Sequence, residues 1–352
     1  MSDSNSYAGW VISTVVGSGE QGCDGDGGPA TAAKLDNPFD VIFDRGGSLV
    51  FSDTFNHRIR RVDAKSGTIE TIAGTGEVGY AGDGGPATMA QFNEPYGLAI
   101  DGAGAIYVAD RLNAVVRRID GVSGLITTFA GTGEKSFIGD GGPATEAAMV
   151  EPNGLTFSRD GAKLYIADVS GNRVRMVDMT NGTLSTFAGT GAAVHDGDGG
   201  AALAAGIFGA RAVAVRPDDG SLYVMERQGS SLRLIDRANG SISTVCSTGE
   251  TGYGGDGGPV ALAIFDRPKE MTLDPSGNVL VVDTENHAIR LIDWANDQVS
   301  TIAGTGETGF NGDGIPSAEA TLARPHGVAI GPDGAFYIGD SENHRIRRVG
   351  PV

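Results

Sequence analysis

Six pairs of adjacent residues lie at matching places in an internal repeat, yet their chemistry differs from copy to copy. They are Phe39-Asp40, Tyr96-Gly97, Asn153-Gly154, Arg211-Ala212, Lys269-Glu270 and His326-Gly327. A second variable position of the repeat contributes Arg111 and Arg227. Guanidinium and ammonium groups bind carboxylates and phosphates, whereas an imidazole, a phenol or a carboxylate can move a proton. Brought together, these side chains would form an anion-binding pocket equipped for acid–base chemistry.

Two kinds of role are expected within such a pocket. The candidate catalytic residues are His326, Tyr96 and Glu270, with Glu270 acting as a base influenced by the charge of Lys269. The candidate substrate-binding residues are Arg211, Arg111, Lys269, Arg227, Asn153, Asp40 and Phe39. A purely structural alternative is that the arginines pair with Asp40 and Glu270 and thereby fill a water-filled hole.

The repeat itself determines which elements position these residues. The phrase Gly-Asp-Gly recurs with its aspartate at Asp26, Asp83, Asp140, Asp198, Asp256 and Asp313, a period of 57 to 58 residues. In the second copy, the segments 95–100, 105–109, 115–119 and 125–130 are short apolar runs separated by turn signals, which indicates four strands and no long helix. Six such units, repeated radially, predict an all-β, six-bladed β-propeller of four-stranded antiparallel blades.

Closure of the ring is predicted from the two ends of the chain. The last copy stops after its third strand, near Val349, and the N-terminal segment 12–17 repeats the pattern of segment 299–304. The N-terminal strand, at about residues 10–17, should therefore complete the C-terminal blade and remove an exposed edge. The whole chain, 1–352, is then expected to be a single domain. In this arrangement the variable pairs begin the innermost strands and meet at one mouth of the central channel.

The repeated phrases resemble a known family. Gly-Asp-Gly-Gly-Pro-Ala, Pro-x-Gly-Leu-Ala-Ile-Asp and Tyr-Val-Ala-Asp-x-x-Asn-x-x-x-Arg, all present around residues 83–117, are similar to the NHL repeat. The resemblance covers the whole chain and implies a six-bladed propeller. It does not imply one function, because propellers include both binding modules and enzymes.

Enzymes with this fold provide a comparison for metal chemistry. The peptide-amidating lyase uses Tyr and Arg with a three-histidine zinc site, and Tyr96, Arg111 and Arg211 resemble only its polar part, since His326 alone is expected at the mouth. A lactonase of the gluconolactonase type needs a Glu, Asn and Asp metal set, which Asn153 with Glu270 or Asp40 could mimic. The surrounding arginines and lysine would oppose a bound cation. We therefore expect no metal and no cofactor.

Other repeated residues are predicted to be structural. An arginine recurs in the third strand and an acid recurs at the end of the second strand, and we interpret the twelve side chains as a buried frame of ion pairs. They are Arg60, Arg117, Arg175, Arg233, Arg290, Arg347, Asp53, Asp110, Asp168, Glu226, Asp283 and Asp340. Loop residues His57, His287 and His344 are interpreted as anchors. The fourth copy departs from the pattern at Glu226 and at 228–230, which indicates either a site or simple sequence drift.

Composition limits the partners. The chain has 44 acidic and 26 basic residues and a formal net charge of −18, which argues against binding to nucleic acid or to anionic membrane surfaces. No apolar run is long enough to span a bilayer, and the start has no export signal, so we expect a cytoplasmic monomer, or a secreted or periplasmic one if a signal peptide has been removed. Cys23 and Cys246 are expected to be free thiols.

Together these observations predict a small-molecule enzyme, namely a metal-independent lyase, isomerase or hydrolase acting on an anionic substrate at the channel mouth. The alternative is a non-catalytic module that recognises a protein, a peptide or a ligand on the same face. A deep pocket lined by the variable side chains would favour the enzyme, and a filled channel beneath a broad apolar patch would favour the recognition module.

Overall fold

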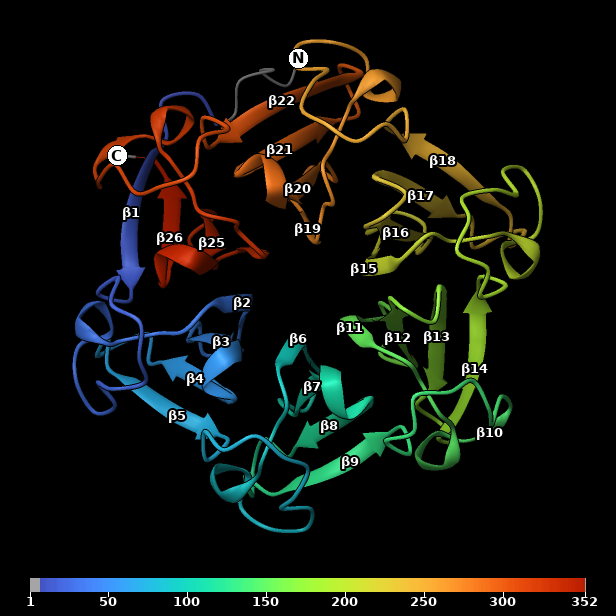
Figure 1. Ribbon diagram of the computed structural model, residues 1–352, viewed down its shortest axis with the longest axis horizontal. Helices are drawn as coiled ribbons and strands as arrows, with labels where there is room; N and C mark the ends of the chain where they lie inside the picture. The colour runs from blue at the N-terminus through green and yellow to red at the C-terminus, as the bar shows by residue number, and fades with distance from the viewer. Residues whose placement is uncertain (1–6, 352) are drawn as a thin grey trace.

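The computed structural model describes residues 7–351, which form six antiparallel β-sheets around a central axis (Figure 1). Each sheet has four main strands, and two sheets carry an additional two-residue strand at the outer edge, β10 (Gly142–Pro143) and β23 (Ile315–Pro316). The predicted all-β, six-bladed propeller of four-stranded blades is therefore confirmed.

The strands of each blade follow one another from the channel outward. The innermost strands are β2 (Pro38–Phe43), β6 (Pro95–Ile100), β11 (Pro152–Phe157), β15 (Ala210–Val215), β19 (Glu270–Leu273) and β24 (Gly327–Ile330). The second strands are β3 (Leu49–Asp53), β7 (Ile106–Asp110), β12 (Lys163–Asp168), β16 (Leu222–Glu226), β20 (Val279–Asp283) and β25 (Phe336–Asp340). The third strands are β4 (Arg58–Val62), β8 (Val115–Ile119), β13 (Arg173–Asp178), β17 (Ser231–Ile235), β21 (Ala288–Asp293) and β26 (Arg345–Gly350). The outer strands are β5 (Ile69–Ala73), β9 (Ile126–Ala130), β14 (Thr183–Ala188), β18 (Ile242–Cys246), β22 (Gln298–Ala303) and β1 (Val11–Val16).

The N-terminal strand closes the ring, as predicted. Strand β1 pairs antiparallel with β26, with Ile12 opposite Val349 and Thr14 opposite Arg347. Both sides of β1 are engaged, because it also pairs with β23. The side chain of Ile12 is fully buried in the apolar cluster between the fifth and sixth blades. The first and last strands of the chain therefore share one sheet, which removes a long unpaired edge.

The core lies between blades. In β3, Val50 and Phe51 point to opposite faces of the sheet, as successive strand residues do, and both are fully buried. Val50 packs in a cluster with residues of the second blade such as Val108, whereas Phe51 packs in a cluster with Ile346 of the sixth blade. Because both faces of a blade are covered, these strands are continuous apolar runs rather than alternating ones.

Five of the six blades contain the predicted ion pair between the third-strand arginine and the acid that ends the second strand. In the third blade Arg175 pairs with the loop residue Asp140 and forms no ion pair with Asp168 within residues 7–351. All six third-strand arginines are fully buried. In the fifth blade, Arg290 contacts Asp283 at 3.0 Å and Asp256 at 2.7 Å, so one guanidinium joins the second strand to the Gly-Asp-Gly loop. That loop aspartate also accepts a hydrogen bond from Thr301. This role of the loop aspartate as a partner of the frame arginine was not predicted from the sequence.

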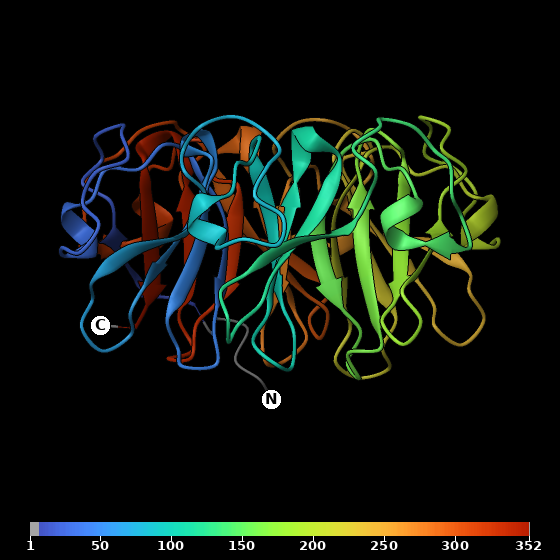
Figure 2. The same ribbon diagram turned by 90° about the horizontal axis from the view of Figure 1, so that it is seen from below.

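Short helices lie at one end of the blades and along their outer side, long loops occupy that same end, and tight turns occupy the other end (Figure 2). Single-turn 3-10 helices of three residues each follow four of the second strands, at η2 (Thr54–Asn56), η4 (Arg111–Asn113), η8 (Thr284–Asn286) and η10 (Ser341–Asn343). Others follow the outer strands, at η1 (Ala30–Ala32), η3 (Ala87–Met89), η5 (Ala144–Glu146), η6 (Ala202–Ala204), η7 (Val260–Leu262) and η9 (Ser317–Glu319). Across residues 7–351 no helix has the length or apolarity needed to cross a bilayer.

The three loop histidines act as anchors between blades. His57, His287 and His344 each adopt a left-handed backbone conformation after a 3-10 turn. Nδ1 of His287 accepts a hydrogen bond from the backbone N–H of Arg324 at 3.0 Å, and Nδ1 of His57 accepts one from Glu94. These bonds join each loop to the start of the next blade's innermost strand, where the candidate site begins.

Candidate functional site

Four of the six innermost strands begin with an irregularity in their pairing with the second strand. In β2 the pairing with β3 shifts register between Pro38 and Val41, which leaves Phe39 and Asp40 outside the regular ladder. The same shift occurs in β6, β11 and β15. Bulges of this kind re-aim side chains and are common beside functional sites. Here two consecutive residues of one strand reach different parts of the channel.

Close packing of the inner strands explains why glycine occupies the second position in three blades. A Cβ atom on Gly97 would lie 2.0 Å from the carbonyl oxygen of Asn153, and one on Gly327 would lie 2.2 Å from that of Phe39. Neighbouring backbones therefore touch at this level, and a side chain fits only where the blades leave room. Asp40 and Glu270 occupy such places.

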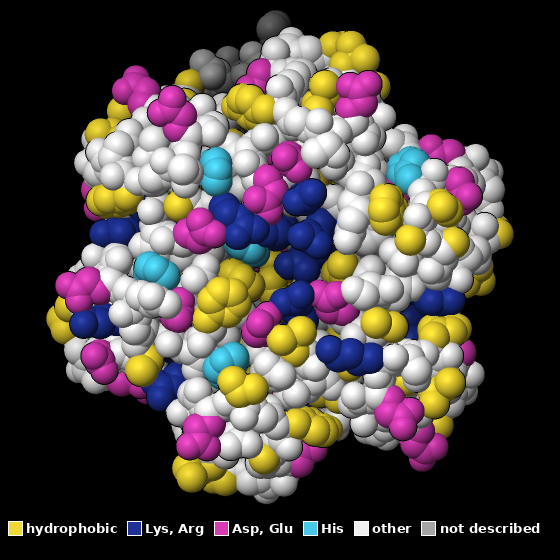
Figure 3. All heavy atoms as spheres, in the orientation of Figure 1, with side chains coloured by type: hydrophobic (Ala, Val, Ile, Leu, Met, Phe, Trp, Pro, Cys, Tyr) yellow, Lys and Arg dark blue, Asp and Glu magenta, His cyan; other side chains and the backbone are white. Residues whose placement is uncertain are grey.

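Six of the ten predicted site residues line one cavity of about 270 Å³ at the channel mouth. They are Phe39, Arg111, Arg211, Arg227, Lys269 and His326. Lysine and arginine side chains gather around the central hollow of this face (Figure 3). The predicted basic cluster is thus present in this acidic protein. The six residues come from five blades: the fourth contributes both Arg211 and Arg227, and the third contributes none.

Two cations of the cavity form no ion pair with any residue of the described part of the chain. Arg211 is 4% exposed, and its guanidinium lies over the ring of Tyr96, 4.2 Å from the centroid. The Nε atoms of both Arg211 and Arg227 are buried without a hydrogen-bond partner, and neither residue forms an ion pair within residues 7–351. Burial, together with the charge of Arg211, lowers the pKa of Arg227. These two guanidinium groups are therefore available to an added anion.

Arg111 differs because its charge is already compensated. Its guanidinium bonds Glu151 at 2.7 Å and also Glu94. Arg324, which the sequence analysis did not single out, also lines the cavity and bonds Glu285 and Glu342, each at 2.8 Å. The rim of the cavity is thus a network of ion pairs, within which Arg211 and Arg227 are exceptions.

Lys269 and His326 form a hydrogen-bonded pair at the cavity wall. Nζ of Lys269 lies 2.9 Å from Nε2 of His326, and Nδ1 of His326 lies 2.8 Å from the backbone carbonyl oxygen of Arg324. Phe39 stacks on the imidazole with 3.9 Å between ring centroids and an interplanar angle of 7°. Burial holds the pKa of His326 well below its usual value, and the charge of Arg211 acts in the same direction, so the imidazole is neutral at neutral pH.

Tyr96 and Asn153 lie behind the cavity wall and do not line it. Tyr96 is buried, burial raises the pKa of its hydroxyl, and that hydroxyl has no hydrogen-bond partner among the described residues. Asn153 is fully buried and donates to the carbonyl oxygen of Glu151 at 2.9 Å. Tyr96 supports Arg211 through its ring, and Asn153 supports the loop that carries Glu151.

Asp40 and Glu270 line a different cavity, of about 240 Å³, together with later residues of the inner strands such as Leu273 and Ala329. Burial raises the pKa of Asp40 to about 7. Burial and the charge of Asp40 raise the pKa of Glu270 well above its usual value. Within the described chain neither carboxyl forms an ion pair with Arg211 or Arg227, which contradicts the structural alternative in which the arginines fill the channel by pairing with these acids.

One replacement in the fourth blade compensates for its missing loop asparagine. In the other blades an aromatic residue or Cys23 precedes the Gly-Asp-Gly loop, whereas this blade has His195. Nδ1 of His195 bonds Glu226, and its Nε2 lies 3.0 Å from Oγ1 of Thr244. In the second blade, Asp110 instead receives a bond from Asn113, a loop residue that the fourth blade lacks. His195 therefore takes over the contact of the missing asparagine.

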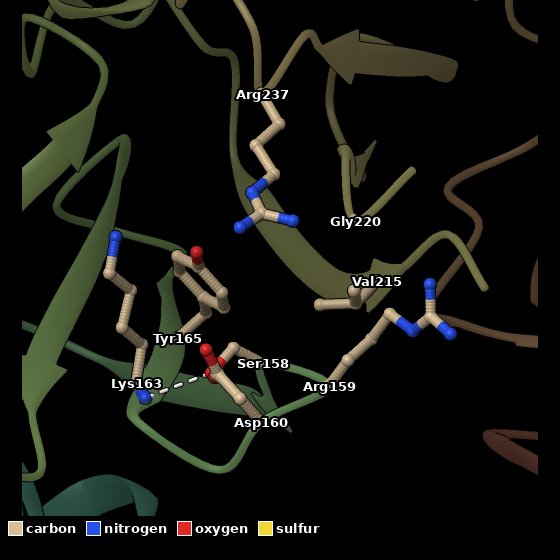
Figure 4. A pocket seen from close by; sticks show the side chains of 8 residues that line it. All are labelled: Ser158, Arg159, Asp160, Lys163, Tyr165, Val215, Gly220 and Arg237. Carbon is tan, nitrogen blue, oxygen red and sulfur yellow. Dashed lines mark hydrogen bonds between the residues drawn. The ribbon is translucent and has the colours of Figure 1, made fainter. Parts of the chain in front are cut away.

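A cleft of about 350 Å³ at the other end of the blades provides a contrast (Figure 4). Lys163 and Arg237 lie around the ring of Tyr165 there, and Arg159 points away from the ring. Arg159 and Arg237 are exposed, and each donates only to a backbone carbonyl, Arg159 to that of Asp218 and Arg237 to that of Asp219. This cleft is a solvated groove between adjacent blades and lacks the buried, unpaired cations of the channel mouth.

The fold places this protein in a class, the six-bladed β-propellers. The family model described as "NHL repeat" matches residues 322–349, which contain strands β24 and β25 and most of β26 in the last blade. The chain is a six-bladed β-propeller that carries an NHL repeat in this blade.

The curated relatives are larger than this chain. It is 28% identical over 290 residues to protein SUPPRESSOR OF QUENCHING 1, chloroplastic, of Arabidopsis thaliana, covering 80% of this chain and 27% of that protein. It is 28% identical over 342 residues to human NHL repeat-containing protein 2, covering 88% of this chain and 45% of that protein. The chain thus spans less than half the length of either relative.

Solved structures share the fold at low sequence identity. An auxiliary nutrient binding protein from Bacteroides thetaiotaomicron superimposes with a TM-score of 0.71 and 17% identity over 97% of this chain and 76% of that one. A virginiamycin B lyase from Staphylococcus aureus superimposes with a TM-score of 0.52 and 15% identity over 90% of this chain and 80% of that one. Propellers of this shape therefore include both a binding protein and a lyase.

Proposed function

We propose that the channel mouth binds a small organic anion and that the protein is a metal-independent enzyme acting on it, of the lyase, isomerase or hydrolase type. The observation that carries the proposal is the pair Arg211 and Arg227. Both guanidinium groups line one cavity, and no carboxylate of residues 7–351 neutralises either. The chain has 44 acidic residues, so unpaired cations at this one place are not a consequence of composition.

Electrostatics indicates what these cations would hold. Two guanidinium groups that share a cavity repel each other, and burial raises the free-energy cost of their charges. A bound carboxylate or phosphate would offset both effects and could accept bidentate hydrogen bonds. A volume of about 270 Å³ suits a small metabolite better than a peptide segment. A small organic acid is therefore the ligand that the cavity fits best.

The cavity also holds groups that could act on such a ligand. Lys269 and His326 are hydrogen bonded to each other at 2.9 Å, and the neutral imidazole can accept a proton. Arg211 and Arg227 would stabilise negative charge that develops on the substrate during reaction. A virginiamycin B lyase has the same fold, which supports the view that a propeller of this shape can perform lyase chemistry.

Differential scanning fluorimetry with a panel of small carboxylates and phosphates tests the proposal. At least one compound should raise the melting temperature of the wild-type protein, because a ligand that binds only the folded state stabilises it. Arg211→Gln should abolish the shift. Arg159→Gln, an exposed arginine of the cleft at the other end of the blades, is the matched control and should keep it. Equal shifts in wild type and Arg211→Gln would refute the anion site.

The second candidate function is that of a non-catalytic module that recognises a protein or peptide. It is favoured by one observation, the 44% exposure of Phe55 beside the cavity. The charged walls of the cavity weigh against a broad apolar docking patch, so we rank the enzyme first.

A further inference from the structure

The side chain of Lys269 is buried, yet its amine reaches the cavity. The residue is 3% exposed and lines the same cavity as Arg211 and Arg227. Nζ lies 2.9 Å from Nε2 of His326 and 3.4 Å from Oε1 of Glu285. The other four lysines, Lys34, Lys65, Lys135 and Lys163, lie outside this cavity. Lys269 is therefore the lysine amine placed beside the unpaired cations.

The hydrogen bonds of His326 determine which atom donates to which. The carbonyl oxygen of Arg324 can only accept, so Nδ1 of His326 carries the proton that forms this 2.8 Å bond. Nε2 of the neutral ring is then an acceptor, and Nζ of Lys269 must be the donor in the Lys269–His326 bond. The stack with Phe39 fixes the plane of the ring. This chain of contacts orients the amine.

Charge at the site favours the neutral amine. Burial, followed by the charge of Arg211, lowers the pKa of Lys269 to about 6. Glu285 acts in the opposite direction, but Arg324 already binds both of its carboxylate oxygens, at 2.8 and 3.0 Å. A neutral amine has a free electron pair, which is what addition to a carbonyl carbon requires.

We propose that Lys269 captures the carbonyl carbon of a short oxo acid as an imine, while Arg211 and Arg227 hold the carboxylate of that acid. The inference deepens the proposed function and rests on it. A carbonyl within one or two carbons of the carboxylate is required, because the amine and both guanidinium groups line one small cavity. Such compounds satisfy the two features of the site at once, the unpaired cations and the amine.

The chemical step balances without an added oxidant or reductant. The electron pair of Nζ forms a C–N bond while the carbonyl π electrons move to oxygen. His326 accepts a proton from nitrogen and returns it to the alkoxide oxygen, which gives a carbinolamine. Loss of the hydroxyl together with the remaining proton on nitrogen releases one water and leaves the C=N bond. The adjacent arginines would stabilise electron density that moves toward the substrate's carboxylate during later bond cleavage.

Reductive trapping tests the inference. The full chain is incubated near neutral pH with pyruvate, acetoacetate or 2-oxoglutarate and reduced with borohydride, and the labelled residue is found by peptide mass mapping. At least one probe should label Lys269 about tenfold or more above each of the other four lysines, because its amine is neutral and oriented. Lys269→Met should remove the label, and Lys163→Met should keep it. Arg211→Gln should reduce labelling of Lys269 about tenfold, since a charged hydrogen bond is lost.

The outcomes separate this inference from the proposed function. If no probe labels Lys269 above the other lysines, while lactate, malate or another carbonyl-free acid still stabilises the wild type in an Arg211-dependent way, the imine is overturned and the anion site stands. If neither oxo acids nor carbonyl-free acids stabilise the protein, both fail. Mapping on the wild-type protein decides the question even if Lys269→Met does not fold.

Discussion

The guanidinium of Arg211 lies 4.2 Å from the centroid of the Tyr96 ring and is not paired with any carboxylate in residues 7–351. Arg290 is also buried but contacts Asp283 and Asp256. Replacing each arginine and measuring the stability of the variants therefore distinguishes a functional cation from a structural one.

Replacing each arginine by methionine should have different effects on stability. Arg290→Met leaves Asp283 buried without its cation and should lower the free energy of unfolding by about 3–5 kcal/mol. Arg211→Met strands no carboxylate and should change stability by less than about 1 kcal/mol in either direction, while removing anion binding. Urea denaturation measures the first quantity, and ligand-induced thermal shifts measure the second. A large loss of stability in Arg211→Met would assign this arginine to the frame.

The N-terminal strand should be required for the stability of the whole ring. Deleting residues 1–17 removes β1, uncovers the edge of β26 and takes Ile12 from an apolar cluster. We expect a broad unfolding transition at a lower temperature, measured by circular dichroism. Adding a synthetic peptide of residues 7–17 should restore the transition in a concentration-dependent manner. An unchanged melting curve after the deletion would show that ring closure contributes little.

Glu270→Gln should remove a pH-dependent loss of stability. Because burial and Asp40 raise the pKa of Glu270, the folded protein holds a proton that the unfolded chain releases above about pH 4.5. The contribution of this group to the free energy of unfolding is fully present below about pH 4.5 and falls as the pH rises. Glutamine can keep the bond to the N–H of Met271 without this penalty. Relative to wild type, the variant's melting temperature should therefore gain about 2 °C or more between pH 5 and pH 8.

Glu134→Gln, at an exposed loop residue, is the matched control and should show no such gain. The same gain in both variants would mean that a general change in net charge is responsible and that the buried carboxyl is not.

Lys269 should affect the pH dependence of stability in the opposite direction to Glu270. Its pKa is lowered to about 6 in the folded protein, so between pH 6 and about pH 10.4 the unfolded chain binds one more proton than the folded protein. The free energy of unfolding should therefore rise with pH, by up to about 1.4 kcal/mol per unit for one full proton. Lys269→Met should lack this increment when urea denaturation is compared at pH 7, 8 and 9. Parallel curves for the two proteins would indicate a charged Lys269 in the folded state.

Much of the architecture could be predicted because the repeat constrains it. The six third-strand arginines and the pairing of residues 11–16 with the last blade follow from strand patterning that recurs in every copy. The cluster of Arg211, Lys269 and His326 could also be predicted, because their position begins the innermost strand. Repetition of the frame and variation at one position are both visible without coordinates.

Other parts of the site depend on geometry that the repeat does not encode. Asp40 and Glu270 follow Phe39 and Lys269 directly in the sequence but line a different cavity. In β2 the register shift between Pro38 and Val41 lies at this place. Arg324 was not predicted, because it lies two residues before the variable position that His326 occupies. The residues at this earlier position also vary from copy to copy, which was the signal available: Asn37, Glu94, Glu151, Gly209, Arg267 and Arg324.

The stack of Phe39 on His326 joins the first blade to the last across the place where the chain's two ends meet. A ligand held in this cavity would contact residues of both the first and the last blade and would therefore stabilise the closed ring. Occupancy of the mouth would then report that assembly of the ring is complete, because a partly assembled chain cannot present both walls together.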